Sequence, residues 1–146
     1  MASSTVPAFK EALFTRLTTA LAPVQVTYGI PAPSGPEREW VWLGGAKATQ
    51  TSAAMGQRRR EEEWVQDVVV SCVRPVRESH QTLTERAFVI SGLIEDSLRT
   101  WSALPPPVFG GIVRTALVTA SDLEEFVSID ERESRITLRI SCTNRI

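Results

Sequence analysis

The sequence predicts an α+β fold in which a mainly antiparallel sheet of four to five strands packs with two helices, in the order α-β-β-β-α-β-β. Three observations lead to this prediction. Two stretches carry apolar residues at helical spacing, several short runs alternate apolar and polar residues, and Gly, Pro or charged residues separate them. The length of 146 residues is typical of one domain. We therefore expect a single domain over 1–146.

Two stretches have a helical period. The first carries apolar residues at every fourth position, namely Phe9, Leu13, Leu17 and Leu21. Pro7 suits its first turn, and Pro23 ends it. The second spans about 79–101 and has its apolar residues in steps of three and four: Leu83, Ala87, Ile90, Ile94, Leu98 and Trp101. The run Thr82-Leu83-Thr84-Glu85 fits a capping box near its start.

The strand signals lie between and after these helices. We expect strands near 24–28, 39–43, 62–74, 112–118 and 136–142, the fourth of which resumes at 126–129, with a proline-rich loop at 31–36. Gly44-Gly45 ends the second of them, and acidic residues at 122–125 mark a bulge or turn. The run 62–74 is apolar on both faces near its middle, so we expect a central, covered strand. The last run alternates cleanly, which indicates one buried face and one solvated face.

Residues 46–60 are small, polar and aperiodic, which predicts a long flexible loop. The loop ends in Arg58, Arg59 and Arg60, and Glu61 and Glu62 follow directly. Three interpretations stay open for this charged run. It is an anion or nucleic-acid contact, a polar segment that orders against a partner subunit through charge pairs, or a solvated loop.

Four tryptophans are more than one small core needs. Trp40 and Trp42 are two positions apart on one strand, so their side chains leave the sheet on the same face. They are interface anchors or core residues, and the sequence leaves both interpretations open. The candidate interface residues are therefore Trp40, Trp42, Arg58, Arg59, Arg60, Glu61 and Glu62.

Composition and motifs restrict the function classes. Lys+Arg total 16 and Asp+Glu total 17, so the net charge of −1 gives no bulk attraction to nucleic acid or an anionic membrane. Cys72 and Cys142 lack metal-site or redox spacing, and we expect free thiols in a reducing cytosol. His80 has no nucleophile partner, and we interpret it as a solvated residue at a helix start. No catalytic, cofactor or metal motif is found, no signal peptide is expected at the N-terminus, and no apolar run reaches membrane-spanning length.

The layout of nearly the whole chain resembles the tail terminator proteins of long-tailed phages. Several segments carry the resemblance: the opening helix from Phe9-Lys10-Glu11-Ala12-Leu13 to Leu21; Val24-Gln25-Val26-Thr27-Tyr28-Gly29 running into the proline loop; Trp40-Val41-Trp42-Leu43-Gly44; the charged loop; Trp64 to Val73; the second helix; and Ile140-Ser141-Cys142-Thr143. The likeness rests on the order of the elements and on the residue pattern within them, and not on a signature motif.

The resemblance implies a structural protein of the virion neck, made in the host cytoplasm. Such proteins form a hexameric ring on the last ring of the major tail tube protein, stop tube growth and present a docking surface to the head-closure or connector protein. DNA passes through the lumen without sequence-specific binding. No catalytic residue, cofactor or metal is implied, and no membrane is involved. We expect 46–60 and 104–111 to order on assembly, in an interface that joins two different patches.

Two alternatives remain. One is another neck component, either a head-closure or a head–tail connector protein. The helix-first order argues for the terminator, since head-closure proteins tend toward small β-barrels. The other is a small ligand-binding or enzymatic α+β domain, which would need a concave apolar pocket with convergent polar groups.

Overall fold

A computed structural model describes residues 4–30, 39–52, 60–103, 109 and 112–145. Its elements are α1 (Val6–Ala20), β1 (Gln25–Thr27), β2 (Glu39–Ser52), β3 (Arg60–Pro75), α2 (His80–Ser102), β4 (Thr115–Val127) and β5 (Glu131–Arg145). The predicted α+β class and element order are confirmed. The proline-rich loop at 31–36 lies outside the described residues, as do most of 104–111.

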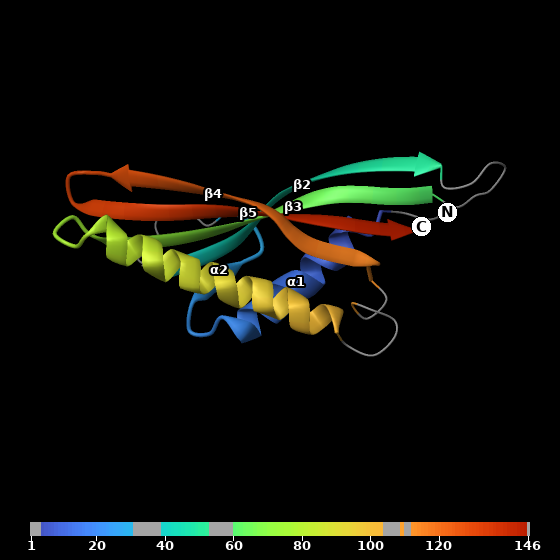
Figure 1. Cartoon of the computed structure of the whole chain (residues 1–146), viewed down its shortest axis with the longest axis horizontal. Coiled ribbons are helices and arrows are strands. Elements are labelled where there is room, and N and C mark those ends of the chain that lie inside the picture. The colour runs from blue at the N-terminus through green and yellow to red at the C-terminus, as the bar shows by residue number, and fades with distance from the viewer. Residues whose placement is uncertain (1–3, 31–38, 53–59, 104–108, 110–111, 146) are drawn as a thin grey trace.

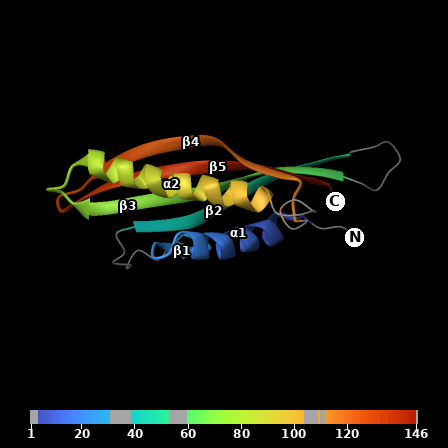
Figure 2. The same ribbon diagram turned by 60° about the horizontal axis from the view of Figure 1, so that its bottom comes forward.

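The five strands form one sheet in the order β1-β2-β3-β5-β4. β1 runs parallel to β2, and the other three pairs are antiparallel. Both helices lie against the same face of this twisted sheet (Figures 1 and 2). We call this the covered face and the opposite one the uncovered face. Neither helix in the described ranges has the length and apolar character needed to cross a bilayer.

α2 follows its predicted period closely. All six residues of the period are buried, so this stripe forms the contact with the sheet. The predicted capping box at 82–85 is wrong. The N-cap is Ser79, whose Oγ accepts the Thr82 backbone N–H at 3.3 Å. A serine at this position satisfies one of the amide groups that have no partner inside the helix.

The core lies between the helices and the covered face. Phe9 of α1 stacks on Trp101 of α2 with ring centroids 5.5 Å apart, and meets Trp64 of β3 edge-on at 5.8 Å. Phe109 closes the cluster against Trp101 at 5.2 Å. Two of the four tryptophans are therefore core residues.

β5 confirms the predicted alternation, with five buried residues on the covered face: Ser134, Ile136, Leu138, Ile140 and Cys142. β3 is central, as expected, but it is not covered on both sides. Val65, Val69 and Val73 lie on the uncovered face and are half-buried. The sequence misleads here because valine fits a pleated strand whether or not a second layer lies above it.

Residues 46–52 are not a loop. β2 continues through Gly44-Gly45, where a β-bulge shifts the register, and pairs with β3 as far as Ser52. Buried Gln66 holds the bulge, because its Nε2 donates to the carbonyl oxygens of Gly44 and Asp67 at 2.9 Å each. A Cβ at Gly44 would lie 3.1 Å from the Cβ of Asp67, so this close approach favours glycine. Residues 53–59 lie outside the described residues, and Arg60 begins β3.

β4 also departs from expectation. It runs unbroken from Thr115 to Val127, and its irregularity falls between Val118 and Ala120 instead of in the acidic run. Pairing with β5 keeps the acidic residues extended, because each of them has a partner residue on that strand. Local charge density alone does not distinguish a turn from an exposed edge strand.

Candidate functional site

The uncovered face of the sheet is the candidate functional surface. Register places Trp40 and Trp42 on this face, opposite Ser71 and Val69 of β3. Both tryptophans are half-buried although neither α1 nor α2, the helices of the described residues, lies on this face. The prediction that they share a face is confirmed. Their place outside the core fits the interface interpretation, whereas Trp64 and Trp101 are core residues.

Arg135 of β5 organises one end of this face. Its guanidinium lies 5.6 Å from the ring centroid of Trp42 on β2 and 4.9 Å from that of Phe126 on β4. Its Nε and Nη2 donate to Glu133 at 2.8 and 3.2 Å, and Ser71 Oγ donates to the same carboxylate at 2.7 Å. The cluster spans all four long strands, and these contacts fix the aromatic rings in place.

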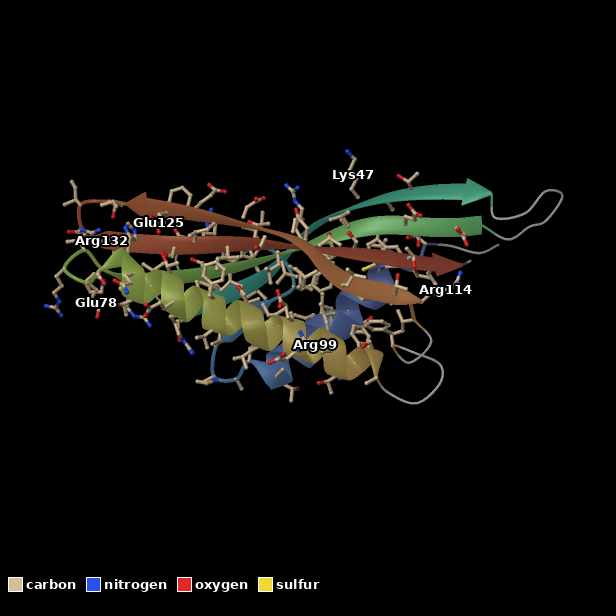
Figure 3. All side chains as sticks on the ribbon, viewed as in Figure 1. Lys47, Glu78, Arg99, Arg114, Glu125 and Arg132 are labelled. Atoms are coloured by element: carbon tan, nitrogen blue, oxygen red, sulfur yellow. The ribbon has the colours of Figure 1, made fainter. Side chains whose placement is uncertain are left out.

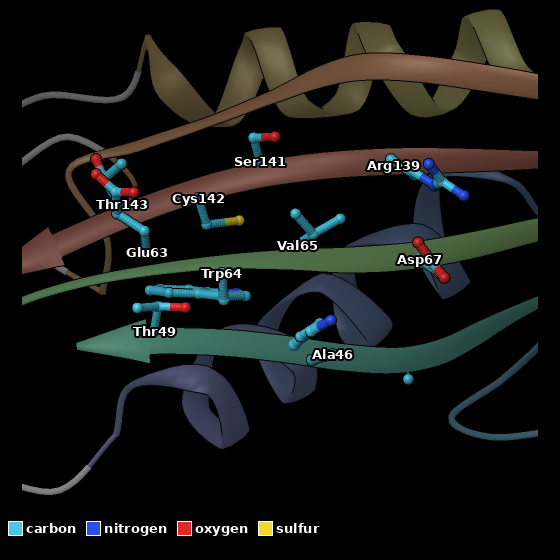
Figure 4. A pocket seen from close by; sticks show the side chains of 12 residues that line it. Ala46, Thr49, Glu63, Trp64, Val65, Asp67, Arg139, Ser141, Cys142 and Thr143 are labelled. Carbon is cyan, nitrogen blue, oxygen red and sulfur yellow. The ribbon is translucent and has the colours of Figure 1, made fainter.

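The other end of the face is hollowed. A cavity of about 870 Å³ lies over β2, β3 and β5 (Figure 4). Its charged lining residues are Lys47, Glu63, Asp67 and Arg139, and Val65, Ser141 and Thr143 lie between them. The mixture of charges gives no strong field for an anion or a cation. Figure 3 shows Lys47 pointing away from the helices.

The hollow offers polar contacts but no assembled nucleophile and base among its described lining residues. The hydroxyl of Ser141 hydrogen bonds with that of Thr119 at 2.8 Å. Cys142 lies beneath the hollow with 1% of its surface exposed, and burial raises the pKa of its thiol to about 12. Burial likewise raises the pKa of Cys72 to about 11. Both thiols are therefore protonated at neutral pH.

His80 is far from the hollow in the fold, at the start of α2. Its Nε2 lies 3.3 Å from the carbonyl oxygen of Phe126, and its Nδ1 lies 3.4 Å from Arg132 Nη1. These contacts join the helix start to the end of β4 and the start of β5. Among the described residues, no cluster of three or more His, Cys, Asp or Glu side chains could hold a metal ion.

An ionic cluster joins the start of β2 to α2. Glu39 accepts hydrogen bonds from Arg86 and lies 3.6 Å from Arg74 Nη2. The hydrogen bond from Arg86, with the positive charges of Arg86 and Arg74, lowers the pKa of the Glu39 carboxyl below its usual value, against the opposing effect of burial. The cluster fastens the strand to the helix.

The charged residues among the candidate interface residues lie in different environments. Arg58 and Arg59 lie outside the described residues. Arg60 begins β3. The carboxylate of Glu61 lies 3.6 Å from Arg114 Nη1 across the sheet.

Glu62 is fully buried on the covered face, and its Oε1 accepts the backbone N–H and the Oγ1 of Thr5 at 2.9 Å each. This carboxylate supports the start of α1, where Thr5 is the N-cap. It is a structural residue of its own chain, although the sequence places it in an exposed charged run. The signal that could have revealed it is the period of two that it shares with Trp64 and Gln66.

Sequence reasoning missed Arg135, Phe126, Lys47 and Arg139 on the uncovered face. The alternation of 135, 137 and 139 with buried residues marks their face on β5. Nothing local shows that β5 lies between β3 and β4, which is what brings Arg135 between the two aromatic rings.

Comparison with known proteins leaves the family open. No protein-family model matches the chain, and no curated protein matches it. A solved structure whose title states no function is similar over 97% of this chain and 96% of its own, with 17% identity and a TM-score of 0.45. A likeness at this level carries no argument about function.

Proposed function

We propose that this protein is a tail terminator of a long-tailed phage. Six copies form a ring that caps the head-proximal end of the tail tube, stops polymerisation of the tube protein and offers the surface on which the head connector docks. The proposal rests on the resemblance of the chain layout and on the uncovered face. DNA passes through the ring without being read, which agrees with the near-neutral charge of the chain.

One observation carries the proposal most: both helices of the described residues lie on one face of a long five-stranded sheet, and the other face presents aromatic rings held in place. Trp42 and Phe126 are fixed by Arg135, and Phe126 is still 40% exposed. Fixed aromatic residues lose little conformational entropy on binding and are frequent anchors of protein interfaces. A surface of this kind is suited to a protein partner.

The edges of the sheet support assembly into a ring. β1, at one edge, has three residues, and β4, at the other, has thirteen. The two edges therefore differ in length and in side chains. Two unlike patches on each subunit are what a closed head-to-tail ring requires.

The test is electron microscopy of particles from a phage that lacks this gene. Overlong, headless tail tubes support the terminator function. Tails of normal length beside filled, unattached heads would make the protein a head-side connector. Intact infectious particles would overturn both and favour the ligand-binding domain, for which the 870 Å³ hollow is the candidate site.

A substitution on the uncovered face tests the surface itself. In the same phage, Trp42→Ala should reproduce the deletion defect while the purified chain stays folded. Val89→Ala is the matched control, because Val89 is a 52% exposed apolar residue on α2, away from this face. Equal assembly by both variants would show that the uncovered face takes no part in the proposed function.

A further inference from the structure

We propose that the groove between α1 and α2 is a binding site for a small carboxylic acid with an apolar body, and that Arg16 of α1 binds the carboxylate. The site belongs to the helical layer, whereas the proposed function uses the uncovered face of the sheet. It goes beyond that function and does not depend on it.

Two hollows meet at Arg16, where α1 and α2 lie next to each other on the covered face (Figures 1 and 2). The first, of about 520 Å³, is lined on the α2 side by Leu93, Ser97 and Thr100, and we call it the polar hollow. The second, of about 490 Å³, lies towards the end of α2, and we call it the apolar hollow. Thr15 and Arg16 line both hollows, so a ligand at Arg16 has access to either.

Arg16 is a positioned cation without an anionic partner. Its guanidinium lies 5.2 Å from the ring centroid of Trp101, which is itself held by stacking on Phe9. Arg16 is half-buried, and its enclosed Nε has no hydrogen-bond acceptor. Among the described residues it forms no ion pair, and its two Nη groups stay accessible. A charge partly removed from water and left unpaired favours the binding of an anion at those Nη groups.

Two hydroxyl groups of α2 add hydrogen-bond donors to the polar hollow. In the described part of the chain, neither the Ser97 nor the Thr100 hydroxyl has a partner, so each can donate to an anion. The hydroxyls of Thr15 and Thr19 are already used, because they donate to the carbonyl oxygens of Glu11 and Thr15 at 3.1 and 3.4 Å. The donors left for a ligand are therefore the guanidinium and two hydroxyls.

The charges around the groove favour a carboxylate over a phosphate. Asp96 lines the polar hollow and pairs with Arg99 at 3.0 Å, and Glu11 lines the apolar hollow. One guanidinium beside two carboxylates can balance a single negative charge better than the nearly double charge of a phosphate. A planar carboxylate also matches the guanidinium fork with two parallel hydrogen bonds.

The apolar hollow gives the ligand its second feature. The small side chains of Ala8 and Ala12 leave the space open, and Trp101, Phe109 and Ile112 supply large apolar surfaces. A short hydrocarbon chain placed there would leave water, and each methylene group that becomes buried should raise the affinity about fourfold. The ligand class that fits both hollows is an acid with an aliphatic or aromatic body.

Titration of the purified full chain with sodium hexanoate, followed by backbone amide chemical shifts, tests the site. We expect saturable shifts at α1 and at the second half of α2. Acetate has the same charged group without the apolar body, and should bind at least about tenfold more weakly. Hexylammonium has a similar body with the opposite charge, and should not bind in the groove.

Variants then identify the residues that bind the acid. Arg16→Gln should weaken hexanoate binding at least about tenfold, and Arg16→Lys should weaken it less because the charge remains. Ala8→Phe fills the apolar hollow from an exposed position, and should weaken hexanoate binding without changing acetate binding. Arg77→Gln is the matched control, because Arg77 is an exposed arginine before the other end of α2. Circular dichroism checks that each variant is folded.

Several results would overturn the proposal. One is the absence of saturable shifts with hexanoate below its micelle concentration. Others are equal binding of hexylammonium, tighter binding of inorganic phosphate than of hexanoate, and an equal loss of affinity in Arg16→Gln and Arg77→Gln. The titration uses the isolated chain, so it can fail or succeed whatever the deletion phage shows about the proposed function.

Discussion

The two faces of the sheet are built from the same strands but have different physical character. On β5, Ile136, Leu138 and Ile140 are at most 1% exposed beneath α2, whereas the alternating Arg135 and Arg139 lie on the uncovered face. Aromatic residues on the covered face pack against one another. On the uncovered face they pack around a charged side chain. One face therefore maintains the fold, and the other is left available for binding.

The largest contrast should come from two tryptophan truncations. Trp64→Ala removes a 2% exposed ring from the core and should lower the free energy of unfolding by about 3–5 kcal/mol. Trp42→Ala removes a half-buried ring from the uncovered face and should cost about 1 kcal/mol. Urea denaturation measures both. Equal losses would mean that the uncovered face contributes to the core.

Two carboxylates extend the comparison to polar groups. Glu62→Ala leaves the partly buried N–H and hydroxyl of Thr5 without this acceptor, and should cost about 1–3 kcal/mol. Glu133→Ala, on the uncovered face, should cost less than about 1 kcal/mol because solvent can replace the lost contacts. Thermal unfolding monitored by circular dichroism compares them. Glu62→Gln, which keeps an acceptor oxygen, should lie between wild type and Glu62→Ala.

The buried thiols test the covered face chemically. With pKa values raised to about 11 and 12, Cys72 and Cys142 should react with a thiol reagent at pH 8 at least about a hundredfold more slowly than a cysteine introduced at an exposed position as Arg139→Cys. Because the folded pKa values are raised, the associated stability is present below the unfolded pKa of about 8.5. It is lost as pH rises towards 11 and above. Rapid labelling of native thiols would show that the covered face opens.

The smallest effect concerns the ionic cluster at the start of β2. The pKa of Glu39 is lowered in the folded chain, so its contribution is present above the unfolded pKa of about 4.3 and is lost as pH falls through the folded value. Glu39→Gln should therefore flatten the acid side of the stability profile. Partial exposure limits the loss at pH 7 to below about 1 kcal/mol. An unchanged pH dependence of stability on the acid side would show that this cluster does not contribute to the stability of the fold.

Local periodicity by itself determined much of this protein. The apolar spacing of α2 and the alternation of β5 specify which side chains are buried, because helix and strand geometry repeat every 3.6 and 2 residues. The shared face of Trp40 and Trp42 follows from the same geometry. These features need no knowledge of neighbouring strands.

Only the tertiary structure decided which face of the sheet is covered by helices. It also decided which segments become strands because a neighbouring strand pairs with them. Residues 46–52 and the acidic part of β4 have no strong strand signal, and they are extended because β3 and β5 lie beside them. The burial of Glu62 and the position of Arg135 between two rings likewise depend on residues far away in the sequence. Such contacts arise from long-range pairing, which a local pattern of residues does not encode.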